Sequence, residues 1–177
     1  MYYPDLTEYK YDKKPFKWLR YVNIGWLDIA KDYSKGTTPK LFSYCLFMIC
    51  TFRINAMMGY HNCSFCETKP YILGVKEKKF NVETILGSAE IRIIGINGKI
   101  YAAPNLIYHY VTKHRYKPPF LFVVSIIISG IFYLPCFLLW CLGFYIPSTL
   151  LSSKRTPGIY RGDKLIKPIS RNNEDDL

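Results

Sequence analysis

The feature that most constrains the fold of this chain is an apolar stretch, residues 119–151, which contains no Lys, Arg, Asp, Glu or His. A membrane-spanning helix needs about 20 apolar residues, so this stretch predicts a transmembrane segment. A tilted single span over 120–142 and a re-entrant hairpin turning at Pro135 both fit; we favour the single span. The stretch separates a domain over residues 1–118 from a polar tail over 152–177, which its composition predicts to be disordered.

The charge balance of the chain is basic. Residues 1–118 carry 18 Lys and Arg against 9 Asp and Glu, a net of +9. Such a balance suits an anionic membrane surface as well as it suits nucleic acid. Because the basic domain adjoins an apolar segment, we expect a lipid bilayer and a protein of unidentified class as partners, and no nucleic acid.

The pattern of residues 1–118 predicts an α+β domain, with a small antiparallel sheet and two or three helices. The clearest local signal is Asn97-Gly98, the preferred pair for a two-residue hairpin turn, which lies between two apolar runs. Apolar periodicity and turn residues predict the remaining elements: strands over 18–26, 70–75, 80–86, 90–94 and 99–102, and helices over 39–52 and 104–115.

Three residues within a short polar segment, His61, Cys63 and Cys66, are the candidate metal ligands. The two-residue gap between the cysteines lets both thiolates reach one ion from a tight turn, and thiolate with imidazole favours zinc. The apolar stripe of the 104–115 helix is centred near the direction of His114. We therefore expect His114 as the fourth ligand, with His109 at the rim as its substitute.

Three other interpretations compete with a structural zinc site. Two packed cysteines without metal explain the same pattern, and a redox dithiol does not fit, because that motif starts a helix after a strand. The third is a zinc-dependent enzyme with one open metal position and Glu90 as base. Whether the chain is an enzyme stays open at this point.

Five blocks follow one another along the chain: Asn23–Asp28, Gly59–Cys66, Gly87–Arg92, Tyr101–Val111 and His114–Pro119. Together these blocks resemble a family of small bacterial domains without an established activity. The resemblance covers about residues 2–120, implies that the blocks belong to one domain, and supplies no mechanism. Members of the family are usually soluble, and this chain departs from them after Pro119, where an apolar segment replaces a polar helical end.

These observations lead to one expected function and location. We expect a membrane-anchored, non-enzymatic binding domain with a structural zinc site, and the zinc-dependent enzyme is the alternative. No apolar signal region follows Met1, and the six cysteines form no disulfide pattern. The domain is therefore expected to face the reducing cytoplasm from a bacterial inner membrane.

Overall fold

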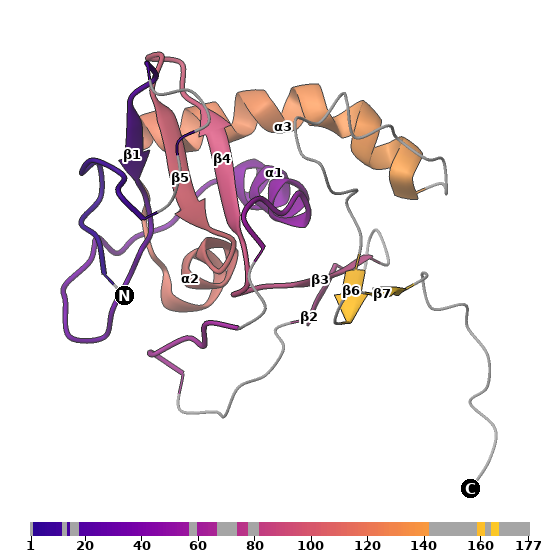
Figure 1. Ribbon diagram of the computed structural model, residues 1–177, viewed down its shortest axis with the longest axis horizontal. Coiled ribbons are helices and arrows are strands. Elements are labelled where there is room, and N and C mark those ends of the chain that lie inside the picture. The colour runs from indigo at the N-terminus through magenta and orange to yellow at the C-terminus, as the bar shows by residue number, and fades with distance from the viewer. Residues whose placement is uncertain are drawn as a thin grey trace, which may run out of the picture.

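The computed structural model describes residues 2–11, 14, 18–56, 60–66, 74–77, 82–141, 159–161 and 164–166. In chain order, its elements are β1 (Tyr21–Asn23), α1 (Lys40–Thr51), β2 (Gly74–Glu77), β3 (Val82–Ile85), β4 (Glu90–Ile94), β5 (Ile100–Pro104), α2 (Ile107–His114), α3 (Phe120–Cys141), β6 (Ile159–Arg161) and β7 (Lys164–Ile166). The predicted α+β class is confirmed: the described residues form three helices and a small central sheet, in the order β1-β5-β4 (Figure 1).

The central sheet is mixed, so the prediction of an antiparallel sheet is wrong for one of its two pairings. β4 and β5 form the predicted hairpin, with Gly98 at a φ of +74° in its turn. β1 instead runs parallel to β5, with Tyr21 opposite Ile100. Parallel strands need a long crossover connection, and the chain between β1 and β5, which includes α1, provides it.

The remaining strand predictions hold in part. β1 is shorter than the predicted 18–26 strand, and Trp26 pairs only through an isolated bridge to Tyr3. β2 and β3 form an antiparallel pair near the predicted 70–75 and 80–86 strands. Both helix predictions are confirmed within a few residues by α1 and α2.

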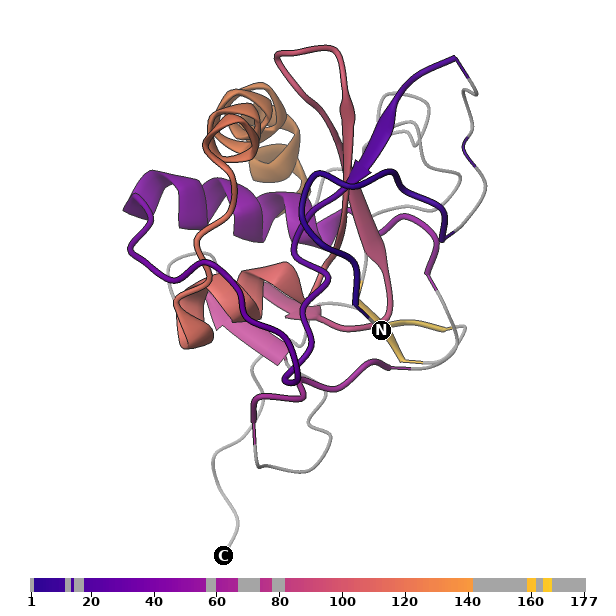
Figure 2. The ribbon, with the colours of Figure 1, turned by 90° about the vertical axis from the view of Figure 1, so that its left-hand side faces the viewer.

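The two faces of the central sheet are covered by different parts of the chain (Figures 1 and 2). Successive side chains of a strand point to opposite faces, and Ile91 and Ile93 of β4 lie in the main core with the helices. On the other face, the N-terminal arm, residues 2–11, covers the sheet and contributes Tyr9 to a smaller cluster with Trp26. The arm therefore supplies part of the hydrophobic cluster on this face of the sheet.

Helix α3 packs against α1 along one side. Phe122 and Ile126 of α3 are fully buried, and the rings of Phe122 and Phe42 make an edge contact at 6.3 Å. Gly130 faces Cys45 of α1 so closely that a Cβ at Gly130 would collide with the cysteine side chain. The first half of the apolar stretch thus belongs to the same core as residues 1–118.

The structure bears on the predicted membrane segment and tail only where they are described. In this part of the chain, no helix combines the length and the apolar character that crossing a membrane requires. Strands β6 and β7 pair within the segment predicted to be a disordered tail. The rest of the predicted segment and tail, residues 142–158, 162–163 and 167–177, lies outside the described residues.

Candidate metal centre

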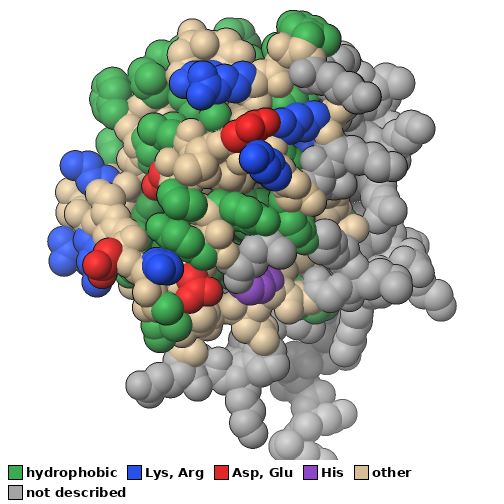
Figure 3. All heavy atoms as spheres, turned by 60° about the vertical axis from the view of Figure 1, so that its left-hand side comes forward, with side chains coloured by type: hydrophobic (Ala, Val, Ile, Leu, Met, Phe, Trp, Pro, Cys, Tyr) green, Lys and Arg blue, Asp and Glu red, His purple; other side chains and the backbone are tan. Residues whose placement is uncertain are grey.

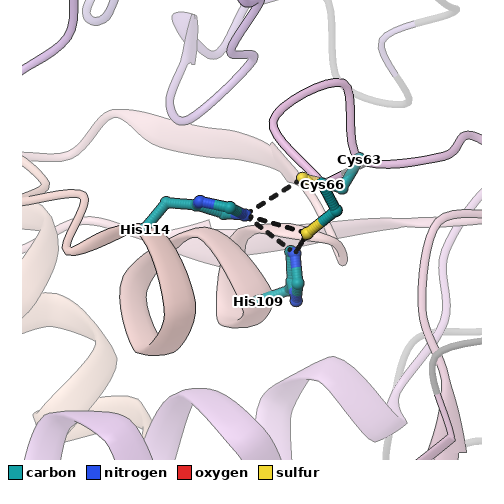
Figure 4. A group of neighbouring side chains, drawn as sticks. All are labelled: Cys63, Cys66, His109 and His114. Atoms are coloured by element: carbon teal, nitrogen blue, oxygen red, sulfur yellow. Dashed lines mark hydrogen bonds between the residues drawn. The ribbon is translucent and has the colours of Figure 1, made fainter. Parts of the chain in front are cut away.

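Four side chains from two elements meet at one point: Cys63, Cys66, His109 and His114 (Figure 4). Their ligand atoms all lie within 4.8 Å of one another. The Nε2 atom of His114 lies 3.2 Å from the Sγ of Cys63, 3.3 Å from the Sγ of Cys66 and 3.1 Å from the Nε2 of His109. The Sγ of Cys66 is also 3.3 Å from the Nε2 of His109.

The cysteines lie on a loop before β2, and a backbone turn brings them together. The amide of Cys66 donates to the carbonyl of Cys63 at 3.4 Å, so the two side chains leave the same side of the turn. Phe65 lies between the two cysteines in the sequence. The centroid of its ring is 5.8 Å from that of the Tyr110 ring and 5.2 Å from that of the His114 ring. The loop is therefore packed onto α2.

Both histidines come from α2. His109 lies in its first turn and is 5% exposed, whereas His114 is its last residue and is partly exposed. The chain reverses at Arg115, which adopts a left-handed conformation with a φ of 54°. The rim position predicted for His109 is wrong: the cysteine loop covers the side of α2 that carries it, whereas the prediction weighed only the apolar side chains.

A glycine holds the cysteine loop against the sheet. The amide of His61 donates to the carbonyl of Gly87 at 2.6 Å, and the amide of Gly87 donates to the Asn105 side chain at 2.7 Å. Gly87 has a φ of +91°, and a Cβ there would collide with the carbonyl oxygen of His61. This anchor was not predicted; its only sequence signal is the glycine that opens the Gly87–Arg92 block.

Burial favours the uncharged form of three of the clustered side chains, His109, His114 and Cys63. It lowers the pKa of His109 to about 4, with further contributions from His114 and Lys113, so its imidazole is neutral and keeps a lone pair. Burial likewise lowers the pKa of His114 and raises that of the Cys63 thiol to about 11. A cation at the centre would reverse the preference of the thiol, because metal binding releases the thiol proton.

The structure thus groups Cys63, Cys66 and His114 of the predicted set, with His109 joining them. His61 lies outside the group; its backbone anchors the loop and the residue lines a neighbouring pocket. Glu90, the predicted base of the enzyme alternative, also lines that pocket.

The carboxylate of Glu90 is engaged by three other side chains. Its Oε1 accepts a hydrogen bond from the hydroxyl of Tyr9 at 2.6 Å, and its Oε2 lies 3.3 Å from both Asn55 Nδ2 and an Arg92 nitrogen. Burial raises the pKa of Glu90, and these three partners oppose that effect.

Comparison with known proteins identifies a family. The family described as "Domain of unknown function (DUF7919)" matches residues 1–127, which include all four clustered side chains and the buried start of α3. None of the curated proteins and none of the solved structures matches the chain. The chain therefore belongs to the DUF7919 family, whose function is unknown.

Proposed function

We propose that this chain is a non-enzymatic binding domain whose fold is completed by a structural zinc ion, and that it is attached to a membrane. The observation that carries the zinc proposal is the convergence of two thiols and two imidazoles from separate elements on one point. Two sulfur and two nitrogen ligands in a tetrahedral arrangement are typical of structural zinc.

The spacing of the ligand atoms supports this choice of metal. With Zn–S near 2.3 Å and Zn–N near 2.0–2.1 Å, a tetrahedral site separates two nitrogens by about 3.3 Å and sulfur from nitrogen by about 3.5 Å. The corresponding separations are 3.1 Å between His109 and His114 and 3.2–3.3 Å between sulfur and nitrogen. Outward shifts of a few tenths of an ångström would admit the ion.

A structural role is favoured over a catalytic one by two features. Four protein ligands fill a tetrahedral shell, whereas catalytic zinc usually keeps one position for water. Glu90, the candidate base, is held by Tyr9, Asn55 and Arg92, and none of these contacts involves the cluster. The ion would join the cysteine loop, which has no helix or strand over residues 60–66, to α2.

The test is the metal content of the purified full chain, compared with single substitutions. We expect about one zinc per chain, lost in Cys63→Ser and in His109→Ala and accompanied by a lower unfolding temperature. His61→Ala is the matched control, because it removes an imidazole close to the cysteines that lies outside the cluster. A chain that binds no zinc in titration, or a Cys63→Ser variant that keeps it, would overturn the proposal.

The closed coordination shell has its own test in the cobalt-substituted chain. A site with four protein ligands should give the visible spectrum of tetrahedral Co²⁺ with thiolate ligands, unchanged when azide is added. An azide-dependent spectrum would indicate an open position and favour the zinc-dependent enzyme.

Membrane attachment rests on the outer face of α3. Phe120, Ile131 and Phe132 are 76%, 57% and 77% exposed. Basic residues precede the helix at Lys113, Arg115 and Lys117. An apolar face beside basic side chains suits insertion into an anionic leaflet.

On the face shown in Figure 3, Lys and Arg side chains are scattered among hydrophobic ones, with no continuous basic patch of the kind nucleic acid requires.

Co-sedimentation with vesicles of phosphatidylcholine and phosphatidylglycerol tests the attachment. We expect the full chain to sediment with the vesicles and Phe132→Glu to weaken the association. Ile29→Glu serves as control, because Ile29 is 65% exposed and lies outside α3. A chain that stays in solution, or equal losses in the two variants, would refute the role of α3. Carbonate extraction then separates a spanning segment, which stays in the membrane, from a surface helix.

A further inference from the structure

A cavity of about 250 Å³ lies beside the candidate metal centre, and both hydrophobic clusters contribute to it: Trp26 from the smaller cluster, and Leu27, Leu106 and Tyr110 from the main core. Its walls come from five parts of the chain: the arm, the segment after β1, the segment after α1, the region around β4 and β5, and α2. Its volume is below the roughly 300–1,000 Å³ of sites for drug-sized ligands, so it has room only for a small molecule. Neither the metal centre nor the outer face of α3 accounts for this cavity.

Four aromatic side chains contribute to the walls of the cavity. Tyr11, Trp26, Tyr60 and Tyr110 line it, and the rings of Tyr11 and Trp26 lie 5.2 Å apart at 53°. The indole nitrogen of Trp26 donates to the carbonyl of Ala102 at 3.1 Å, which fixes the ring in place. Rigid aromatic faces attract apolar groups, and they attract cations through the negative charge of the ring face.

One carboxylate supplies the charge of the cavity. Glu90 is the only acidic residue among its described lining residues, and none of them is Lys or Arg. The side chain of Glu90 is 3% exposed, and its two oxygens contact Tyr9 and Arg92, neither of which is a described lining residue. A carboxylate accepts about four hydrogen bonds, and three are used here, so one acceptor position remains for a ligand.

The combination of a fixed acceptor with aromatic walls selects one class of ligand. The counter-charge of Glu90, Arg92, pairs with it at 3.3 Å but is not among the described lining residues, so an anionic ligand would meet the Glu90 oxygens and not the guanidinium. A protonated amine would instead donate to that carboxylate and lie against ring faces. Because the buried partners of Glu90 already orient it, binding would require little reorganisation of the site.

We propose that this cavity binds a small organic amine, whose ammonium group faces the Glu90 carboxylate and whose apolar body packs against Trp26 and Tyr110. The binding site is separate from the candidate metal centre. It gives this domain a ligand-binding activity in addition to the proposed structural zinc site.

Three probes that share an aromatic body test the charge selection: phenethylamine, phenethyl alcohol and phenylpropionate. They are titrated into the full chain labelled with ¹⁵N-tryptophan, and the indole signal of Trp26, assigned with Trp26→Phe, reports occupancy. We expect the amine to shift this signal with a Kd at least about tenfold below that of the alcohol, and phenylpropionate to leave it unmoved. An amine that does not shift the signal, or an anion that binds as well, would overturn the proposal.

Substitutions locate the binding. Glu90→Gln keeps the shape of the side chain and should abolish the preference for the amine over the alcohol. Tyr60→Ala, at the rim, keeps the proposal testable if Glu90→Gln does not fold, and should raise the Kd for the amine severalfold. Tyr44→Ala on α1 is the matched control, because Tyr44 is 42% exposed and Tyr60 43%. Equal effects of the two tyrosine substitutions, or an amine preference that survives in folded Glu90→Gln, would refute the assignment.

Discussion

Replacing Gly87 with alanine is expected to destabilise the domain and to weaken metal binding, although Gly87 is not itself a candidate ligand. Gly87 has a φ of +91°, and a Cβ there would collide with the carbonyl oxygen of His61. The collision pushes the cysteine loop away from the sheet and breaks the 2.6 Å hydrogen bond between the amide of His61 and the carbonyl of Gly87. The loop carries Cys63 and Cys66, so their sulfurs move away from the two imidazoles.

The magnitude follows from two contributions. A left-handed backbone costs a non-glycine residue about 1–2 kcal/mol, and a lost hydrogen bond costs about 1 kcal/mol. We therefore expect Gly87→Ala to lower the free energy of unfolding by roughly 2–3 kcal/mol.

Gly98 provides a matched control within the same chain. Its φ is +74°, but a Cβ there would meet no atom within 4 Å. Gly98→Ala should therefore cost only the backbone contribution, about 1–2 kcal/mol, and leave metal affinity unchanged. Urea unfolding measures the first quantity, and competition with a chromophoric zinc chelator measures the second. If Gly87→Ala costs no more than Gly98→Ala and binds zinc as the wild type does, the proposed anchoring of the loop is refuted.

Further substitutions test the buried ion pair, the seat of α3 and the metal. Arg92→Met should destabilise the domain by about 3–5 kcal/mol at pH 7, because it leaves Glu90 buried without its counter-charge. Burial already raises the pKa of Glu90 above its ordinary 4.5, and losing the guanidinium raises it further. A carboxyl group with a raised pKa contributes stability that is complete at low pH and lost as the pH rises. The loss of unfolding free energy in Arg92→Met should therefore be smaller in urea unfolding at pH 4 than at pH 7. A loss that does not depend on pH would contradict this reasoning. In the same assay, Phe122→Ala should lower the free energy of unfolding by about 3–5 kcal/mol, because Phe122 is fully buried. Phe120→Ala should lower it little, because Phe120 is 76% exposed. Equal losses in the two variants would exclude the packing of α3 described above. Chelation should lower the unfolding temperature of the wild type and leave that of Cys63→Ser unchanged, and an equal change in both would show that the metal acts elsewhere.

The elements that the sequence predicts well are those that depend on neighbouring residues. Asn97-Gly98 predicts the β4–β5 hairpin, because the turn alone sets the register of that pair. The parallel pairing of β1 with β5 joins Tyr21 to Ile100 and depends on the path of the intervening chain, which no local pattern records. The mixed sheet was therefore not predictable from these residues.

The candidate site also has one part that local sequence predicts, the cysteine pair, and one part that depends on the tertiary fold, the pair of histidines. The spacing of Cys63 and Cys66 indicates a shared ion because both lie in one turn. The choice of histidines depends on which side of α2 the cysteine loop covers, and the apolar stripe of the helix does not encode this. His61 is nearer in sequence to the cysteines than His109 is, yet its anchoring to Gly87 leaves it outside the cluster.

The separation of the two ligand pairs along the chain affects how the domain folds. Cys66 and His109 are 43 residues apart, and β2, β3, β4 and β5 lie between them. A metal ion held by both pairs closes this segment into a loop, and the entropy of loop closure opposes that step until the hairpin has brought α2 near the cysteines. In the unfolded chain the cysteine pair alone offers an ion two ligands, so complete coordination follows the formation of β4–β5. A filled site would therefore require synthesis of the chain past His114, and we expect the β4–β5 hairpin to form before an ion is fully coordinated.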